Sequence, residues 1–193
     1  MKRHLYFLAA WILAGFATTV MAQTPADLSW KWMRDASFDA NNLFLPTASE
    51  SEKKLLEKIW AKEIRAAGVM EDGGRYPSFA VIGTFEHQGT AVILTMYDRA
   101  DYVCDPAPNG RGAVDLFSTC PLRVIRINSN GQYTVQNLPK NFCMLYGDDP
   151  NNPREKKHLE YAFDERSGIV YLRLIQHGKI AASCNRSVRI FKG

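Results

Sequence analysis

The spacing of hydrophobic positions changes at the turn 71–74, and this change separates a helical region from a region of strands. Between residues 50 and 67 the apolar side chains recur every three or four positions, which is the spacing of one helix face. Ser49 and Glu52 fit a capping box at the start of this segment, and Gly68 suits the position after its last turn. We therefore predict an amphipathic helix over residues 50–67 that buries Trp60.

Beyond this turn the pattern is that of strands joined by short turns. Gly-containing turn sequences at 87–89, 129–132 and 164–168 each separate two apolar runs, which favours three hairpins. The predicted strands span 79–85, 90–97, 122–128, 133–138, 158–163, 169–175 and 187–191. The sequence thus predicts a single α+β domain over residues 23–193, with the helix packed on a largely antiparallel sheet of about seven strands.

The first 22 residues have the pattern of a secretory signal peptide. A basic Met-Lys-Arg-His start precedes an uncharged apolar run at 5–16, and Val20-Met21-Ala22 provides a cleavage pattern before Gln23. The apolar run is shorter than the roughly 20 residues that cross a bilayer. We expect a periplasmic or secreted protein that begins at Gln23 and has no membrane span.

All four cysteines follow residue 22, and an even number in an oxidising compartment predicts two disulfides, each contributing about 2–4 kcal/mol. We favour Cys104–Cys120, which closes a Pro- and Gly-rich excursion at 105–112, and Cys143–Cys184, which ties a loop to the C-terminal strand region. Two other pairings remain open. A cysteine metal site is a weaker alternative because the chain has no CxxC pair.

Charge and motifs narrow the function classes. Removal of Lys2 and Arg3 leaves 22 basic residues against 20 acidic ones, a formal charge of +2 that does not call for a nucleic-acid partner. The chain has no GxSxG elbow, no HExxH and no Gly-rich phosphate loop. Its three histidines beyond residue 22 are expected to be solvated residues at turns or strand ends: His87, His158 and His177. We expect a binding protein with no catalytic residues, cofactor or metal. A small secreted hydrolase is kept as an alternative, ranked after the two binding functions named below.

One short pattern lies at the turn of the third predicted hairpin. Ser167, Gly168 and Tyr171 form Ser-Gly-x-x-Tyr, and Lys179 follows near another turn. This pattern resembles the signature of bacterial periplasmic lysozyme inhibitors of the membrane-bound and C-type group. The resemblance implies that Ser167 and Lys179 enter a lysozyme cleft and bind its catalytic acids, as a hydroxyl and an ammonium group on a rigid hairpin can do.

A second candidate binding element is the loop of the first predicted disulfide. Arg111 lies there between Gly110 and Gly112, so its guanidinium can reach into an acidic groove and pair with a carboxylate. The leading hypothesis is therefore an inhibitor or immunity protein whose partner is a peptidoglycan-degrading enzyme or toxin. A periplasmic ligand-binding or envelope-accessory protein is the alternative. A cleft-blocking protein should have a projecting hairpin, and a ligand-binding protein should have a concave pocket.

Overall fold

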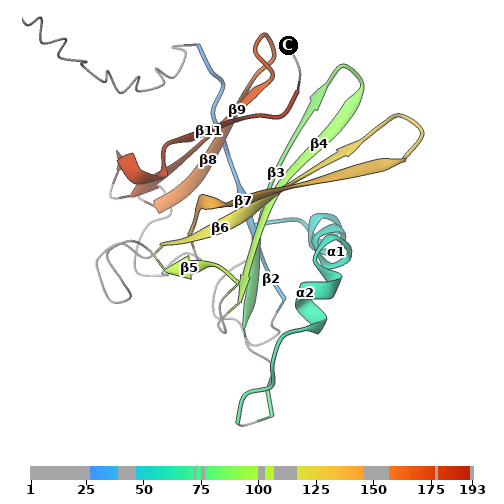
Figure 1. Ribbon diagram of the computed structural model, residues 1–193, viewed down its shortest axis with the longest axis vertical. Helices are drawn as coiled ribbons and strands as arrows, with labels where there is room; N and C mark the ends of the chain where they lie inside the picture. Colours follow the sequence, from blue (N-terminus) through green and yellow to red (C-terminus); the bar gives the residue numbers. More distant parts are fainter. Residues whose placement is uncertain are drawn as a thin grey trace, which may run out of the picture.

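The computed structural model describes residues 27–38, 47–71, 73–74, 77–99, 103–106, 117–145, 157–176 and 178–191. The predicted signal peptide, His177 and Arg111 lie outside these ranges. Within them the chain forms two antiparallel sheets and two short helices, arranged as sheet, sheet and helices in three layers (Figure 1). The region contains no helix that is long and apolar enough to cross a membrane.

The first sheet, sheet A, is built on a hairpin near the C-terminus. Its central strands β8 and β9 pair along their whole length. A short strand, β1, pairs with β8, while β10 and β11 share the other edge of β9. The bounds are β1 (Lys31–Trp32), β8 (Lys157–Asp164), β9 (Ile169–Gln176), β10 (Lys179–Ile180) and β11 (Arg186–Arg189), with a 3-10 turn, Ala182–Cys184, between the last two.

The second sheet, sheet B, has the strand order β2-β3-β4-β6-β7, and β5 pairs with the start of β6. Two long hairpins, β3–β4 and β6–β7, form most of it. The bounds are β2 (Arg34–Ser37), β3 (Ser78–His87), β4 (Thr90–Arg99), β5 (Asp105–Pro106), β6 (Phe117–Ile127) and β7 (Tyr133–Leu145).

The structure confirms a largely antiparallel fold with the three predicted hairpins, but its strands differ from the expectation in number and arrangement. The described residues contain eleven strands in two sheets instead of about seven in one. The four strands that the sequence did not predict have only two to four residues, too few to show a period of two. The division into two sheets depends on the segment 31–37, which pairs first with β8 and then with β3.

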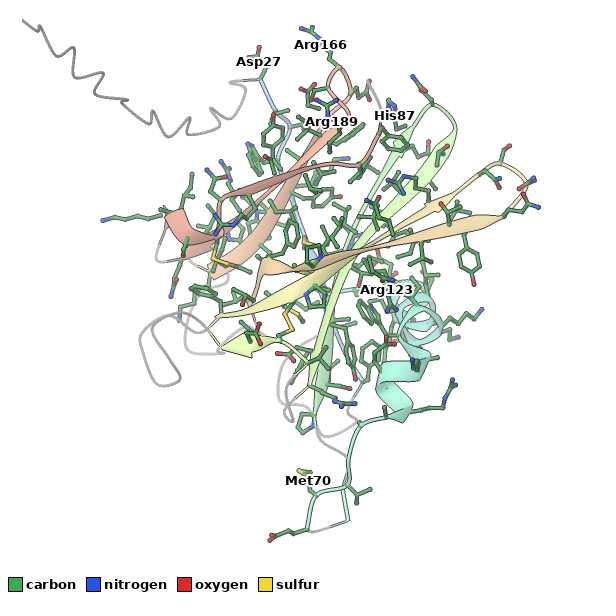
Figure 2. The ribbon with its side chains drawn as sticks, viewed as in Figure 1. Asp27, Met70, His87, Arg123, Arg166 and Arg189 are labelled. Carbon is green, nitrogen blue, oxygen red and sulfur yellow. A yellow bond between two sulfur atoms is a disulfide. The ribbon has the colours of Figure 1, made fainter. Side chains whose placement is uncertain are left out.

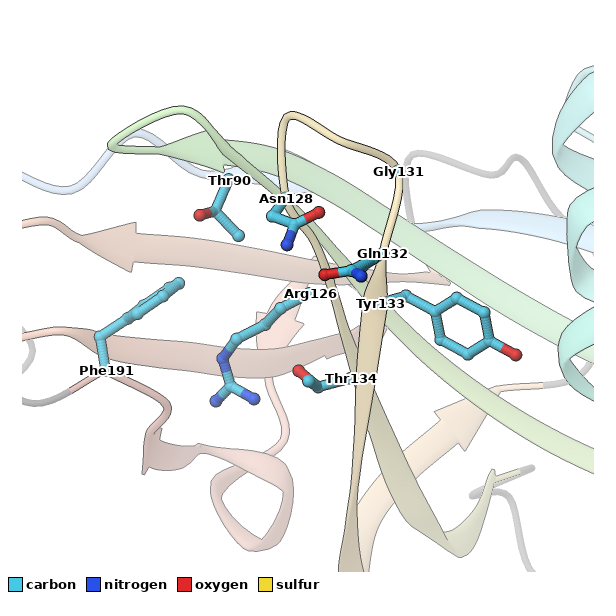
Figure 3. A pocket seen from close by; sticks show the side chains of 8 residues that line it. All are labelled: Thr90, Arg126, Asn128, Gly131, Gln132, Tyr133, Thr134 and Phe191. Carbon is cyan, nitrogen blue, oxygen red and sulfur yellow. The ribbon is translucent and has the colours of Figure 1, made fainter.

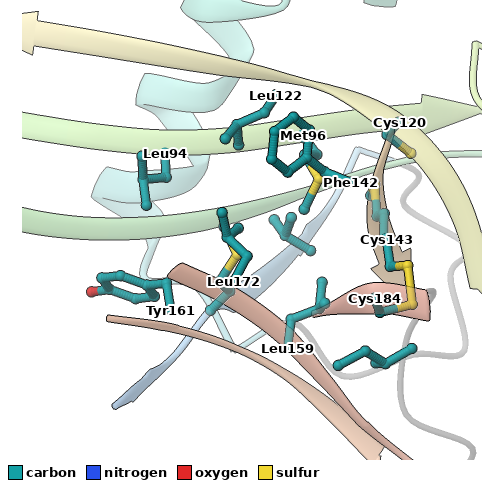
Figure 4. Packing of buried hydrophobic residues seen from close by; sticks show 14 of the residues in the cluster. Leu94, Met96, Cys120, Leu122, Phe142, Cys143, Leu159, Tyr161, Leu172 and Cys184 are labelled. Carbon is teal, nitrogen blue, oxygen red and sulfur yellow. A yellow bond between two sulfur atoms is a disulfide. The ribbon is translucent and has the colours of Figure 1, made fainter. Parts of the chain in front are cut away.

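The main hydrophobic core lies between the two sheets. Leu94 and Met96 of sheet B face Leu159 and Leu172 of sheet A, and all four side chains are buried (Figure 4). Alternate residues of β4, among them Ile93 and Tyr97, point to the opposite face and pack against the helices. The central strands of sheet B are therefore buried on both faces, so they contain nearly continuous apolar runs.

Both predicted disulfides are present. Cys104–Cys120 fixes the segment after β4 to β6, and Cys143–Cys184 joins β7 of sheet B to the 3-10 turn beside sheet A. The second bond thus connects the two sheets covalently, as Figure 4 shows. Two intramolecular disulfides indicate that the protein folds in an oxidising compartment.

The predicted helix is divided into two. Its capping box is confirmed: Glu52 N donates to Ser49 Oγ, and Ser49 N donates to the Glu52 carboxylate. However, α1 (Glu50–Ile59) stops at Trp60, and α2 (Ala61–Arg65) ends before Gly68. The break coincides with a bond from sheet B, in which Arg123 Nη1 donates to the carbonyl of Ile59 at 2.6 Å. A guanidinium from β6 therefore caps the C-terminal end of α1.

Trp60 lies at this break and connects the helices to sheet B, as the sequence predicted. It is 2% exposed, and its ring stacks on Tyr97 with the centroids 5.2 Å apart. Its Nε1 donates to Thr95 Oγ1 at 3.0 Å. The guanidinium of Arg123, a residue of β6, lies 3.8 Å from the Trp60 ring centroid.

We predict that Trp60→Ala lowers the free energy of unfolding by about 3–5 kcal/mol, because it leaves a cavity and an unpaired buried hydroxyl on Thr95. Trp60→Phe should cost less, since it keeps most of the apolar contact. Denaturant melts measure both, with Tyr133→Ala as control because Tyr133 is 69% exposed. A loss below about 1 kcal/mol for Trp60→Ala would contradict the packing role.

Candidate functional site

The tips of the three hairpins and the C-terminal segment lie at one end of the molecule, which we call the hairpin end (Figure 2). It comprises residues 87–90, 128–132, 164–168 and 189–191. Ring contacts connect its parts: His87 lies 5.0 Å from Phe163 and 4.6 Å from Phe191, measured between centroids. Phe85 stacks on Phe163 at 4.4 Å and extends this aromatic cluster toward the core. His87 is therefore half-buried between aromatic rings, whereas the sequence reading placed it in solvent.

A cavity of about 650 Å³ opens beside this cluster, between the tip of β6–β7 and the C-terminal segment. Figure 3 shows the Arg126 guanidinium between Phe191 and Thr134, while the Tyr133 ring points away toward the helices. The cavity is lined by Thr90, Arg126, Asn128, Gly131, Gln132, Tyr133, Thr134 and Phe191.

Arg126 is partly buried and has no acidic partner among the described residues. Its Nη2 donates to Gln136 Oε1 at 2.8 Å and to the carbonyl of Ile190, and its Cζ lies 5.2 Å from the Phe191 ring centroid. Burial lowers the pKa of Arg126 from its ordinary value. A guanidinium nevertheless stays protonated in proteins, so the cavity contains a positive charge without a compensating carboxylate.

Arg126 was not among the residues selected from the sequence, although the strand pattern contains the signal. Arg126 shares a strand face with Leu122 and Val124, which point into the core between the sheets. Opposite them, β7 places Thr134 and Gln136 on the same face by its register with β6. The inner face of sheet B therefore changes from apolar to polar toward the hairpin end, and a charged residue at an inward position marks the change.

Ser167 and Gly168 form the tip of β8–β9, and both have structural contacts. Ser167 Oγ donates to Asp164 Oδ2 at 2.5 Å inside the turn. Gly168 has φ +66°, and its carbonyl accepts from Ile190 N at 2.9 Å and from Phe191 N at 3.1 Å. A Cβ at Gly168 would lie 2.6 Å from the Phe191 carbonyl oxygen. The turn selected from the sequence thus holds Phe191, which forms one wall of the Arg126 cavity.

The other residues of the pattern do not join Ser167. Tyr171 is 8% exposed and points to the outer face of sheet A, away from the core that contains Val170 and Leu172. Lys179 is exposed on β10 and pairs with Gln176 at the far end of β9. At about 3.3 Å per residue, the length of β9 separates Ser167 from Lys179 by more than about 20 Å. Arg111, the second candidate, lies outside the described residues.

The outer face of sheet A has a network of charged and aromatic side chains. Glu160 accepts from His158 Nε2 at 2.9 Å and from Arg173 Nε at 2.6 Å. Trp32 packs on His158 with ring centroids 4.2 Å apart, and Arg173 lies 3.7 Å from the Trp30 ring centroid. His158 is 7% exposed instead of solvated, and a carboxylate lies within its reach. Because Arg173 also binds the Glu160 carboxylate, the His158–Glu160 pair is part of an ion network.

A buried carboxylate, Asp98, organises the segment after β4. Its Oδ1 accepts from three backbone N–H groups at 2.8–3.0 Å, those of Arg99, Val103 and Cys104. Burial raises the pKa of Asp98, and these hydrogen bonds only partly offset that effect. Asp98 lies close to Cys104 and Cys120, but the two sulfur atoms are joined in a disulfide. Asp98 and the Cys104–Cys120 disulfide therefore stabilise the segment after β4, and the two sulfur atoms are not available as metal ligands.

Comparisons of the chain with protein-family models, with curated proteins and with solved structures gave no match. The resemblance of residues 167–171 to lysozyme inhibitors therefore stays a prediction.

We predict that Gly168→Ala destabilises the protein more than Gly178→Ala. Both glycines have positive φ, +66° and +73°, so each substitution costs about 1–2 kcal/mol of backbone strain. A Cβ at Gly178 meets nothing within 4 Å, whereas at Gly168 it meets the Phe191 backbone. We expect Gly168→Ala to cost about 1–3 kcal/mol more in a denaturant melt. Equal losses would contradict the close approach of the C-terminal segment.

The Glu160 network should stabilise the protein in a pH-dependent manner. Burial raises the pKa of Glu160, but the bonds from His158 and Arg173 outweigh it, so the pKa lies below its ordinary value. A lowered carboxyl pKa stabilises the fold above about pH 4.3, and this stabilisation is lost as pH falls through the folded-state pKa. Glu160→Gln should therefore destabilise most near pH 7 and least in acid, as chemical melts at several pH values would show.

The control for this measurement is Glu57→Gln, because Glu57 is exposed on α1 and forms no hydrogen bond or ion pair within the described chain. A Glu160→Gln effect that is constant between pH 7 and pH 3 would contradict the ionic role of the network.

Proposed function

We propose that this chain is an exported, periplasmic binding protein that blocks a peptidoglycan-degrading enzyme, as an inhibitor or immunity protein, with its hairpin end. The observation that supports the proposal is the gathering of three hairpin tips at one end of a disulfide-bonded body. This arrangement meets the requirement for a rigid projecting element that inserts into a cleft.

Internal hydrogen bonds hold two of the tips in fixed conformations. In β6–β7, Gln132 N donates to Asn130 Oδ1 at 3.0 Å, and Asn128 N donates to the carbonyl of Gln132 at 3.0 Å. In β8–β9, the Asp164 carboxylate accepts from Arg166 N and from Ser167 Oγ. A turn that is already ordered loses little conformational entropy on binding, which favours tight association.

The shape of the hairpin end supports the proposal more strongly than its charge. Arg166 and Arg189 are exposed there and suit a groove lined by carboxylates, as in a glycoside hydrolase. Glu86 and Glu165 are also exposed, so the surface is mixed in sign. Ser167 remains a contact residue under this proposal only if the partner replaces Asp164 as its acceptor.

A second candidate function is ligand binding, and the Arg126 cavity is the observation that favours it. A recess of this size is within the usual range for small-molecule sites, roughly 300–1,000 Å³. Its walls are mostly apolar, and the charge of Arg126, which no carboxylate balances among the described residues, points to an anionic ligand.

The test is inhibition of a panel of lysozymes and peptidoglycan amidases by the purified protein that begins at Gln23. We expect inhibition of at least one enzyme, weakened tenfold or more, about 1.4 kcal/mol, by Arg166→Glu at the tip of β8–β9. Ser167→Ala and Arg111→Ala test the two elements selected from the sequence. Lys62→Glu on α2 is the matched charge reversal away from the hairpin end and should leave inhibition unchanged. No inhibition of any wall-degrading enzyme would overturn the proposal.

A further inference from the structure

We propose that the Arg126 cavity binds the carboxylate group of a peptide. This inference deepens the second candidate function, ligand binding, and names the chemistry of its ligand. It concerns the recess between the sheets, whereas the inhibitory proposal concerns the projecting tips.

The first argument comes from the other arginines that form ion pairs in the structure. Arg34 pairs with Glu52, Arg123 with Glu63 and Arg173 with Glu160. Arg126 is buried to a similar degree, yet no carboxylate lies within ion-pair distance of it in the described part of the chain. Partial burial of an unpaired charge is unfavourable, so a bound carboxylate would supply the missing partner.

The second argument concerns the donors that Arg126 has left. Both of its protein hydrogen bonds come from Nη2, to Gln136 and to the carbonyl of Ile190. The N–H groups on Nε and Nη1 have no acceptor within the described residues. These bonds fix the guanidinium plane while leaving three of its five N–H groups for a ligand. A carboxylate is a strong acceptor for such groups.

The third argument concerns the walls of the cavity. The side chains of Thr90, Asn128 and Thr134 make no hydrogen bond within the described chain, and they face the space beside Arg126 (Figure 3). Hydroxyl and amide groups both donate and accept, which suits the alternating N–H and C=O groups of a peptide. Phe191 supplies one apolar wall for a side chain. A phosphate group would call for a larger positive charge than this single guanidinium, whereas one carboxylate matches it.

A peptide carboxylate has two sources, a free C-terminus and an acidic side chain. Four probes separate them by calorimetric titration of the protein that begins at Gln23. Acetyl-Ala-Ala has a free C-terminus, acetyl-Ala-Ala-amide has none, acetyl-Ala-Asp-amide has only a side-chain carboxylate, and sodium acetate has no peptide group. We expect at least one of the two carboxylate peptides to bind at least tenfold more tightly than both the amide and acetate. The stronger of the two identifies the source.

Three variants assign the binding to the cavity. Arg126→Gln should weaken it at least tenfold, whereas Lys62→Gln removes an equal charge from the exposed face of α2, away from the cavity, and should have no effect. Because Arg126 also bonds to Ile190, Arg126→Gln can disturb the fold; Thr134→Phe therefore fills the cavity while leaving both bonds of Arg126 in place, and it should weaken binding as well. A circular dichroism melt of each variant confirms folding.

Equal binding of the acid and amide peptides, unchanged binding by both cavity variants, or no binding at millimolar peptide would overturn the inference. These outcomes are independent of the enzyme panel. Inhibition of an enzyme without peptide binding would overturn only this inference, and peptide binding without inhibition would overturn only the inhibitory role.

Discussion

The arrangement of the two sheets depends on one side chain, Tyr161, which crosses the core from sheet A to sheet B. Because β2 pairs with β3 only as far as Ile82, the backbone groups of Thr84 lie beyond the end of β2. The Tyr161 hydroxyl donates to the Thr84 carbonyl at 2.7 Å and accepts from Thr84 N at 3.0 Å. Gly83 makes this approach possible, since a Cβ there would lie 2.8 Å from the tyrosine ring. A side chain thus replaces the missing strand neighbour.

Thr84 has no neighbouring strand on the β2 side because the segment 31–37 passes from sheet A to sheet B before it reaches that level. Lys31 and Trp32 pair with β8, and Met33 N still donates to the carbonyl of Leu159 before Arg34 begins its pairing with β3. From this point toward the hairpin end the sheets no longer share a strand. The space between them is closed by the aromatic cluster of His87, Phe163 and Phe191 and remains open at the Arg126 cavity.

Arginine side chains from the sheets organise much of the remaining structure. Arg34 holds the first turn of α1 through Glu52, and partial burial of that carboxyl is outweighed by the bonds from Arg34 and Ser49, which lower its pKa. Arg123 caps the end of α1 and covers Trp60. Arg126 lies on the same strand but on the opposite face, and the part of the chain that the structure describes gives it only neutral acceptors. Arg123 therefore stabilises the fold, whereas Arg126 faces the cavity with a charge that no carboxylate of the described residues balances.

The sequence by itself determined the features that depend on neighbouring residues. The capping box at Ser49, the three hairpins and the burial of Trp60 follow from local patterns, and the sequence favoured the two observed disulfides among three possible pairings. Only the tertiary structure decided the features that depend on distant contacts. The predicted helix is interrupted after Ile59, where Arg123 of β6 caps the Ile59 carbonyl, and the chain divides into two sheets where segment 31–37 pairs first with β8 and then with β3. The Ser167–Gly168 turn also holds Phe191, because the C-terminal segment returns beside it and only a glycine leaves room there.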